Sequence, residues 1–194
     1  MIYNGLPVYS LEITDEISGV KAVSIVDDPA IMNNFLKFSE DKEILLSKDN
    51  EKRDLYGPIL IPDQLIYRKG DGAGYYVTFS AETIEALQKK YFMEGANFNL
   101  SLDHDGNPIR AYVFESFLKD SENGIVPAQW PDLPDGTWFI RAHIDDEAAW
   151  EKIKDEDLRG FSIECMMGVT RLEAEKPAEK PAESLLDSLL DGSF

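Results

Sequence analysis

The chain has 194 residues, enough for one sizeable domain with extensions, and 37 acidic against 19 basic side chains give a formal net charge of −18. Such a surface repels phosphate backbones, which counts against nucleic-acid binding as the main function. The single cysteine, Cys165, excludes an internal disulfide and fits a reducing cytoplasm. We expect neither a signal peptide nor a membrane anchor, because the N-terminus lacks a basic leader and no apolar run approaches the roughly 20 residues that span a bilayer.

Composition predicts three regions along the chain. Residues 1–55 form an N-terminal extension, in which "GVKAVSIVDDPAI" reads as a strand and a turn, followed by a heavily charged connector. Residues 56–172 carry the clearest strand pattern and are expected to form the core. Residues 173–194 combine a mobile linker, "EKPAEKPAE", with a leucine-rich end, "SLLDSLLDGSF". That end is interpreted either as a docking peptide for a partner groove or as a frayed terminus.

The first half of the core predicts a hairpin and a helix. Two strand-like runs, "YGPILIPDQLIYR" and "GYYVTFS", flank the glycine-rich "KGDGAG". A phosphate loop would open into a helix, so a hairpin loop is favoured here. Ser80 then caps a helix over 81–92, in which Ile84, Leu87 and Tyr91 form one buried stripe.

The second half of the core predicts more strands and a second helix. Three strand-like runs follow, "ANFNLSLDHDG", "NPIRAYVFESFLK" and "GTWFIRAHI". A short helix, "DDEAAWEKIKDE", precedes a last strand-like run, "RGFSIECMMGVTRL". Many short strands with two helices indicate an α+β fold: a barrel-like, mostly antiparallel sheet flanked by helices, with an extended C-terminal tail.

The two histidines are sorted by strand alternation, because successive side chains point to opposite faces. His104 falls on the face of the leucines in "NLSLDHD", whereas His143 lies opposite the apolar face of its run and is expected to face solvent. The same test places Glu115 on an apolar face, where a charge is costly unless it is paired. An imidazolium on the neighbouring strand, about 5 Å away, would be a suitable partner.

Ser162, in "LRGFSIEC", is the candidate nucleophile, with His104 as the base and Glu115 as the carboxylate that orients it. Glu164 is a rival orienter, since it shares a strand face with Ser162. Ordinary structural roles remain open for each residue. His104 can be a hydrogen-bonded core histidine, Ser162 a small residue after a turn, and Glu115 one half of an ion pair.

Two other chemistries receive less support. In "DHD", Asp103 and Asp105 point away from His104 if the run is a strand, so the three make a poor metal site. A metal-dependent hydrolase is therefore a third interpretation, and no cofactor is expected. Cys165 shares a face with Ile163, which favours inert burial over nucleophilic chemistry.

Taken in order, several segments resemble the phage prohead maturation proteases of the XkdF-like kind. The matching segments are "AVSIVDDPAI", "LDHD", "AYVFESFL", and "GTWFIRAHIDDEAAWEKIKDEDLRGFSIE". That family is similar to the herpesvirus assemblins, so the resemblance implies a serine protease with helices around a β-barrel. It assigns the histidine and serine roles to His104 and Ser162. Assemblins use a second histidine after the serine, whereas His143 precedes Ser162, which leaves Glu115 as our choice for the third position.

The resemblance also implies function and partners. Such proteases cleave scaffold and capsid precursor, and often themselves, inside the assembling prohead in the host cytoplasm. The expected partners are the phage scaffold and the major capsid protein, with the portal and a second copy of the chain as further candidates. Backbone N–H groups are the default oxyanion hole, and Arg171 is an additional candidate. The competing function is a non-enzymatic capsid assembly or scaffold-type protein on the same fold.

Overall fold

The computed structural model describes residues 1–27, 29, 47–49, 52–69, 73–155, 158 and 160–172, with 47–49 and 155 described by their backbone alone. Its strands form three sheets. The five-stranded sheet has the order β1 (Ile2–Tyr3), β2 (Leu6–Glu12), β7 (Tyr75–Thr78), β6 (Ile66–Arg68), with β12 (Gly168–Arg171) also paired to β2. The four-stranded sheet has the order β4 (Ser47–Asp49), β5 (Asp54–Leu60), β10 (Trp138–Ile144), β9 (Ala111–Leu118). The three-stranded sheet has the order β11 (Gly160–Met166), β3 (Gly19–Val26), β8 (Leu100–Leu102).

Most of the strand pairs are antiparallel, and two are parallel. β2 pairs with β7 in parallel, as does β3 with β8, and both pairs have the long connection that parallel strands require. β6 and β7 pair antiparallel around the "KGDGAG" segment, which confirms the predicted hairpin. The fold is thus α+β. The described strands form three separate sheets and no closed barrel.

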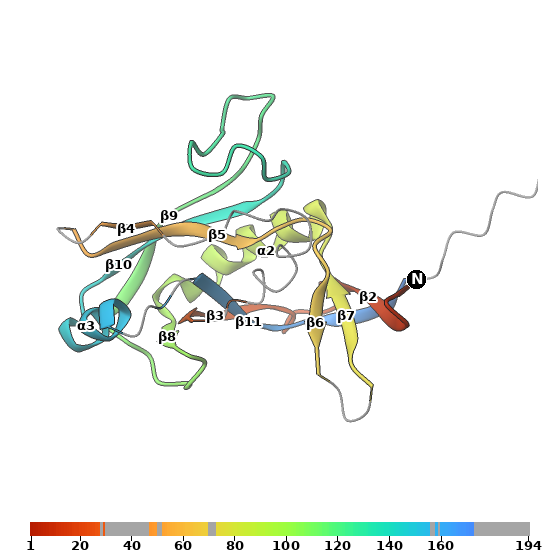
Figure 1. The fold of residues 1–194 in the computed structure, drawn as a ribbon, viewed down its shortest axis with the longest axis horizontal. Helices are drawn as coiled ribbons and strands as arrows, with labels where there is room; N and C mark the ends of the chain where they lie inside the picture. The colour runs from red at the N-terminus through yellow and green to blue at the C-terminus, as the bar shows by residue number, and fades with distance from the viewer. Residues whose placement is uncertain are drawn as a thin grey trace, which may run out of the picture.

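Helix α2 (Ala81–Met93) lies between the sheets and forms where the sequence predicts it. The backbone N–H of Thr83 donates to Ser80 Oγ at 3.2 Å, which caps the first turn. The predicted stripe of Ile84, Leu87 and Tyr91 is fully buried. Figure 1 shows α2 between the four-stranded sheet and β3, and the helix contacts both β3 and β10. The helix therefore packs between the four-stranded sheet, which contains β10, and the three-stranded sheet, which contains β3.

Two shorter helices complete the described structure. The 3₁₀ helix η1 (Ala96–Phe98) follows α2, and α3 (Glu147–Asp155) follows β10. Asp146 caps α3 by accepting a hydrogen bond from the Ala149 N–H at 3.1 Å. No helix in the described part of the chain is long and apolar enough to cross a membrane.

The last strand-like run of the sequence is two strands rather than one. β11 ends at Met166 in the three-stranded sheet, and β12 begins at Gly168 in the five-stranded sheet. A Cβ atom at Gly168 would overlap the Thr14 side chain, so glycine allows the close approach at which the chain changes sheets. This switch brings the two sheets together along β11.

The connection between β9 and β10 is held by a buried lysine. The Lys119 side chain is 6% exposed, and its Nζ donates to Asp135 Oδ1 at 2.8 Å and to Ser121 Oγ at 2.9 Å. The hydrogen bond from Lys119, assisted by Ser121, lowers the pKa of Asp135 from 3.8 to about 2. The loop is therefore closed by a charge pair that persists well into acid.

Some predictions fall outside the described residues. These are the charged connector before residue 47 and the C-terminal region 173–194 with its leucine-rich peptide. Within the described part, β2 and β3 come from the predicted N-terminal extension, and they pair with strands of the predicted core. The domain boundaries themselves stay a prediction.

Candidate active site

Three serines line up across the three-stranded sheet. Ser162 of β11 is the antiparallel partner of Ser24 on the central strand β3, and Ser24 is the parallel partner of Ser101 on β8. Each serine lies between two larger apolar residues, as in "VSI", "LSL" and "FSI", so each strand turns its apolar residues to the opposite face. The sheet thus carries a polar row on one face and the hydrophobic core on the other.

Glu164 joins this row from the same face of β11 as Ser162. The Ser24 hydroxyl donates to Glu164 Oε1 at 3.0 Å and lies 2.6 Å from the Ser101 hydroxyl. Since Ser24 has only one proton to give, Ser101 donates to Ser24, and the proton chain runs toward the carboxylate. Ser24 is 0% exposed and Ser101 4%, so this network supports Glu164 from beneath.

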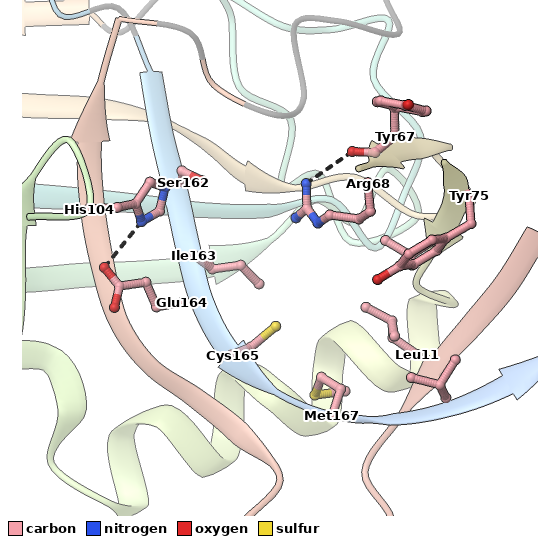
Figure 2. A pocket seen from close by; sticks show the side chains of 12 residues that line it. Leu11, Tyr67, Arg68, Tyr75, His104, Ser162, Ile163, Glu164, Cys165 and Met167 are labelled. Carbon is pink, nitrogen blue, oxygen red and sulfur yellow. Dashed lines mark hydrogen bonds and ion pairs between the residues drawn. The ribbon is translucent and has the colours of Figure 1, made fainter. Parts of the chain in front are cut away.

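His104 reaches the same carboxylate from the turn after β8. Its Nδ1 lies 3.1 Å from Glu164 Oε1 (Figure 2). Asp103 and His104 both have positive φ, 47° and 56°, a conformation that costs non-glycine residues free energy but that Asp and His tolerate better than most. The turn is held by hydrogen bonds from the Asp103 N–H to the Ile25 carbonyl and from the Asp105 N–H to the Leu102 carbonyl. A strained backbone thus aims the imidazole at Glu164.

Strand alternation therefore does not apply to His104. β8 ends at Leu102, and the chain has turned before it reaches the histidine. The predicted grouping of His104 with the buried leucines is wrong, because its side chain is 41% exposed. Its position depends on the tertiary hydrogen bond to β3, which strand periodicity does not reveal.

The contact with Glu164 determines which nitrogen of the imidazole faces away from the carboxylate. With Nδ1–H donating to the carboxylate, Nε2 carries the lone pair and can accept a proton. Ser162 and His104 both line one cleft of about 650 Å³. Glu164, which contacts the ring, lies two residues from Ser162 on the same face of β11, a spacing of about 6.6 Å along a strand. Among the described residues no hydrogen bond joins the two, although in many enzymes such bonds tighten only when substrate is bound.

The exposure of the three serines distinguishes them chemically. Ser162 is half-buried and lines the cleft, whereas Ser24 and Ser101 lie under Glu164 and are buried. A nucleophile must reach a substrate carbonyl, and of the three serines only Ser162 lines the cleft. The other two were missed from the sequence, although the repeated pattern of a serine between apolar residues marks all three.

Glu115 lies elsewhere, in the four-stranded sheet. It is exposed on β9, forms an ion pair with Arg141 at 3.1 Å, and does not line the cleft. Its predicted burial is wrong because β9 contains a β-bulge. Arg141 pairs with Glu115 but the next residue, Ala142, pairs with Val113, so Phe114 is an extra residue that reverses the alternation.

His143 lies on the face of β10 opposite the buried Ile140, Ala142 and Ile144, as alternation predicts. It is half-buried rather than open to solvent, because its Nδ1 lies 2.9 Å from Asp54 Oδ1 and its ring packs on Tyr112. Neither His143 nor Arg171, which is exposed at the end of β12, lines the cleft. His104 is thus the histidine of the candidate site.

The described residues give no geometric support to a metal or cysteine centre. No cluster of three His, Cys, Asp or Glu side chains suited to a metal ion occurs in the described ranges. Cys165 lines the cleft, but burial raises the pKa of its thiol, which outweighs the opposing effect of Arg68. A raised pKa keeps the sulfur protonated and weakens it as a nucleophile.

A serine, a histidine and a carboxylate gathered at one cleft are the groups that serine hydrolases use. Residues 41–171, more than half of the chain, match a family model of phage serine proteases. The family is described as "Putative phage serine protease XkdF", and the chain belongs to it. No curated protein and no solved structure gives a match. The predicted family resemblance is therefore confirmed.

Proposed function

We propose that the chain is a serine endopeptidase in which Ser162 is the nucleophile, His104 the general base and Glu164 the carboxylate that positions the base. The observation that carries the proposal is the 3.1 Å contact between His104 Nδ1 and Glu164 Oε1, in the cleft that Ser162 lines. Membership of a phage serine protease family supports peptide-bond hydrolysis as the reaction. Glu115 has no part in the proposal, because it is bound to Arg141 in another sheet.

Each residue has a defined step in this reaction. His104 Nε2 takes the proton of Ser162 while Oγ forms a bond to the scissile carbonyl carbon. The imidazolium then gives that proton to the departing amine as the C–N bond breaks, leaving an acyl ester on Ser162. Water, deprotonated by the same nitrogen, attacks the ester carbonyl, and the imidazolium returns a proton to Ser162 Oγ as the acyl C–O bond breaks and the acid product leaves. Glu164 stabilises the imidazolium in both halves and is itself held by the Ser24 hydroxyl.

The biological role that we propose is cleavage of scaffold and capsid precursor, and of the chain itself, during phage head assembly. The support for this role is membership of the phage serine protease family. The resemblance to prohead maturation proteases implies that the cleavage takes place inside the prohead, with scaffold and major capsid protein as partners. The portal and a second copy of the chain are further candidate partners. The competing role is that of an assembly protein which retains the fold without catalysis.

A fluorophosphonate probe tests the nucleophile without knowledge of the natural substrate. Attack by an activated serine oxygen expels fluoride and leaves the phosphonyl group on the protein, which intact-mass spectrometry detects. We expect wild type and Ser10→Ala to be labelled once, and Ser162→Ala and His104→Ala to remain unlabelled. Ser10 is a matched control because it lies on β2 and does not line the cleft.

Co-expression with the scaffold and capsid proteins of the parent phage tests the substrate. We expect truncated scaffold, capsid protein or protease in the presence of wild type, and intact masses with Ser162→Ala. Activity that survives Ser162→Ala would refute the assignment of the nucleophile. Intact masses for all proteins in assembled shells, together with no probe labelling, would establish the non-catalytic assembly role instead.

A further inference from the structure

The cleft extends well beyond Ser162, along the outer edge of β11. Four successive residues of the strand, Ser162 to Cys165, line it, and Met167 continues the series. Because successive side chains point to opposite faces of a strand, a cleft lined by consecutive residues runs along the edge of the sheet. Among the described strands β11 pairs only with β3, so no described strand forms a ladder along its other edge, although β5 lies close to β11. An extended peptide can therefore add here as a further strand.

The opposite wall of the cleft combines aliphatic side chains with two tyrosines, Tyr67 and Tyr75, and one cation. Leu11, Val77 and Val169 come from the five-stranded sheet, and Arg68 projects from the end of β6 (Figure 2). The Arg68 guanidinium donates to the Tyr67 carbonyl at 3.3 Å, and in the described part of the chain no carboxylate forms an ion pair with it. The net charge of the protein is −18, yet this half-buried arginine has no acidic partner among the residues that the structure describes.

The charge of Arg68 acts inside the cleft. It lowers the pKa of the Cys165 thiol, in opposition to the larger effect of burial. Figure 2 shows Arg68 across the cleft from Ile163, and Cys165 on the same side of the strand as Leu11. A ligand lying along β11 would therefore meet aliphatic side chains, two tyrosines and a guanidinium whose fork matches the two oxygens of a carboxylate.

We propose that this cleft binds an extended peptide segment that carries an aliphatic side chain and, close by, a carboxylate, and that Arg68 pairs with that carboxylate. The inference rests on the proposed function, because it takes Ser162 as the catalytic end of the same cleft. It makes Arg68 a specificity-determining residue and acidic–aliphatic segments the substrate class. A lysine or an amide at the same place in the substrate would leave the guanidinium unpaired in a partly desolvated site.

Binding to the full-length Ser162→Ala protein tests this without turnover. The probes are fluorescein-labelled eight-residue peptides of alanine with two leucines and one Asp, which is moved through successive positions. A second set carries Asn in place of Asp. Fluorescence anisotropy measures each affinity, and a charged hydrogen bond predicts that at one or more positions Asp binds about 10- to 100-fold more tightly than Asn.

Variants locate the effect. Adding Arg68→Gln is expected to abolish the preference for Asp while leaving the Asn peptides unchanged, and Arg68→Lys is expected to restore part of it. Lys154→Gln is the control, since it removes an exposed cation on α3, outside the cleft. The bound peptide should also slow alkylation of Cys165, the only cysteine, by N-ethylmaleimide.

The inference is overturned if no position favours Asp, if the preference survives Arg68→Gln, or if Lys154→Gln reduces it equally. Binding that leaves Cys165 alkylation unchanged would overturn it too, because the peptide would then lie elsewhere. These outcomes are independent of the fluorophosphonate experiment. If the probe labels Ser162 but peptide binding does not depend on Arg68, the protease assignment stands and the Arg68 subsite is refuted. If binding depends on Arg68 but the probe does not label Ser162, the peptide-binding cleft stands and the nucleophile is refuted.

Discussion

Replacing Ser24 by alanine removes one oxygen atom from a fully buried position beneath the candidate site. That oxygen donates to Glu164 Oε1 at 3.0 Å and accepts from the Ser101 hydroxyl at 2.6 Å. The change leaves no significant cavity, so its effect reports on the hydrogen bonds. It deprives Glu164 of its buried donor and leaves the Ser101 hydroxyl without a partner at a site that is 4% exposed.

The magnitude follows from these two losses. A hydrogen bond to a charged group contributes about 1.5–3 kcal/mol, and a buried hydroxyl left unpaired costs about 1–3 kcal/mol. Glu164 is 39% exposed, so water replaces part of what it loses, and we expect a net destabilisation of about 2 kcal/mol. For a chain of this size that corresponds to a melting temperature lower by about 4–8 °C.

Thermal and urea unfolding followed by circular dichroism measure the effect. The double variant Ser24→Ala/Ser101→Ala is the informative comparison, because it removes the unpaired hydroxyl and should be little less stable than Ser24→Ala alone. Additive losses, within about 0.5 kcal/mol, would show that the two hydroxyls are not coupled and would refute the network. Ser24→Ala should slow fluorophosphonate labelling relative to wild type. In a protein that already carries Glu164→Gln, adding Ser24→Ala should slow labelling no further.

Three other predictions concern the third residue, acid stability and a glycine. Glu164→Gln should slow probe labelling by about 10²-fold or more, whereas Glu115→Gln should leave it within about twofold; equal effects would contradict the assignment. The lowered pKa of Asp135 means that its ion pair stabilises the fold above about pH 4 and is lost as the pH falls toward 2, so the stability gap between wild type and Asp135→Asn should close over that range in acid unfolding. Gly136→Ala should destabilise more than Gly124→Ala in urea unfolding: both have positive φ, 82° and 75°, but only at 136 would a Cβ atom meet a neighbour, at 2.9 Å. Equal losses would show that packing at 136 is not limiting.

Local patterns predicted the parts of the fold that depend on local physics. Helix α2 and its cap follow from the spacing of Ile84, Leu87 and Tyr91 after Ser80, because a helical face is defined by residues three and four apart. The hairpin between β6 and β7 follows from its glycine-rich loop. How the strands divide among three sheets was not predicted, since pairing between distant segments leaves no periodic signal in one sequence.

The candidate site was predicted in part. Ser162 and His104 line the same cleft, and their catalytic roles stay predictions. Glu115 was placed on the wrong face because a single inserted residue in β9 reverses every later side chain, and one sequence does not reveal such a bulge. Glu164 could be named as the rival from its spacing to Ser162. Its hydrogen bond from Ser24 could not be predicted, because it depends on how β3 and β11 align.

The family match begins at residue 41, yet the strand in the middle of the site's sheet is β3, at Gly19–Val26. A recombinant fragment trimmed to the matched range would take away the strand that both β8 and β11 pair with, together with the β2 strand that holds β12. The matched range therefore omits two strands that pair with strands inside it. Fragments for expression or domain grafting should therefore include the chain from β1 (Ile2–Tyr3) onward, so that β2 and β3 are present to hold the strands that carry the candidate site.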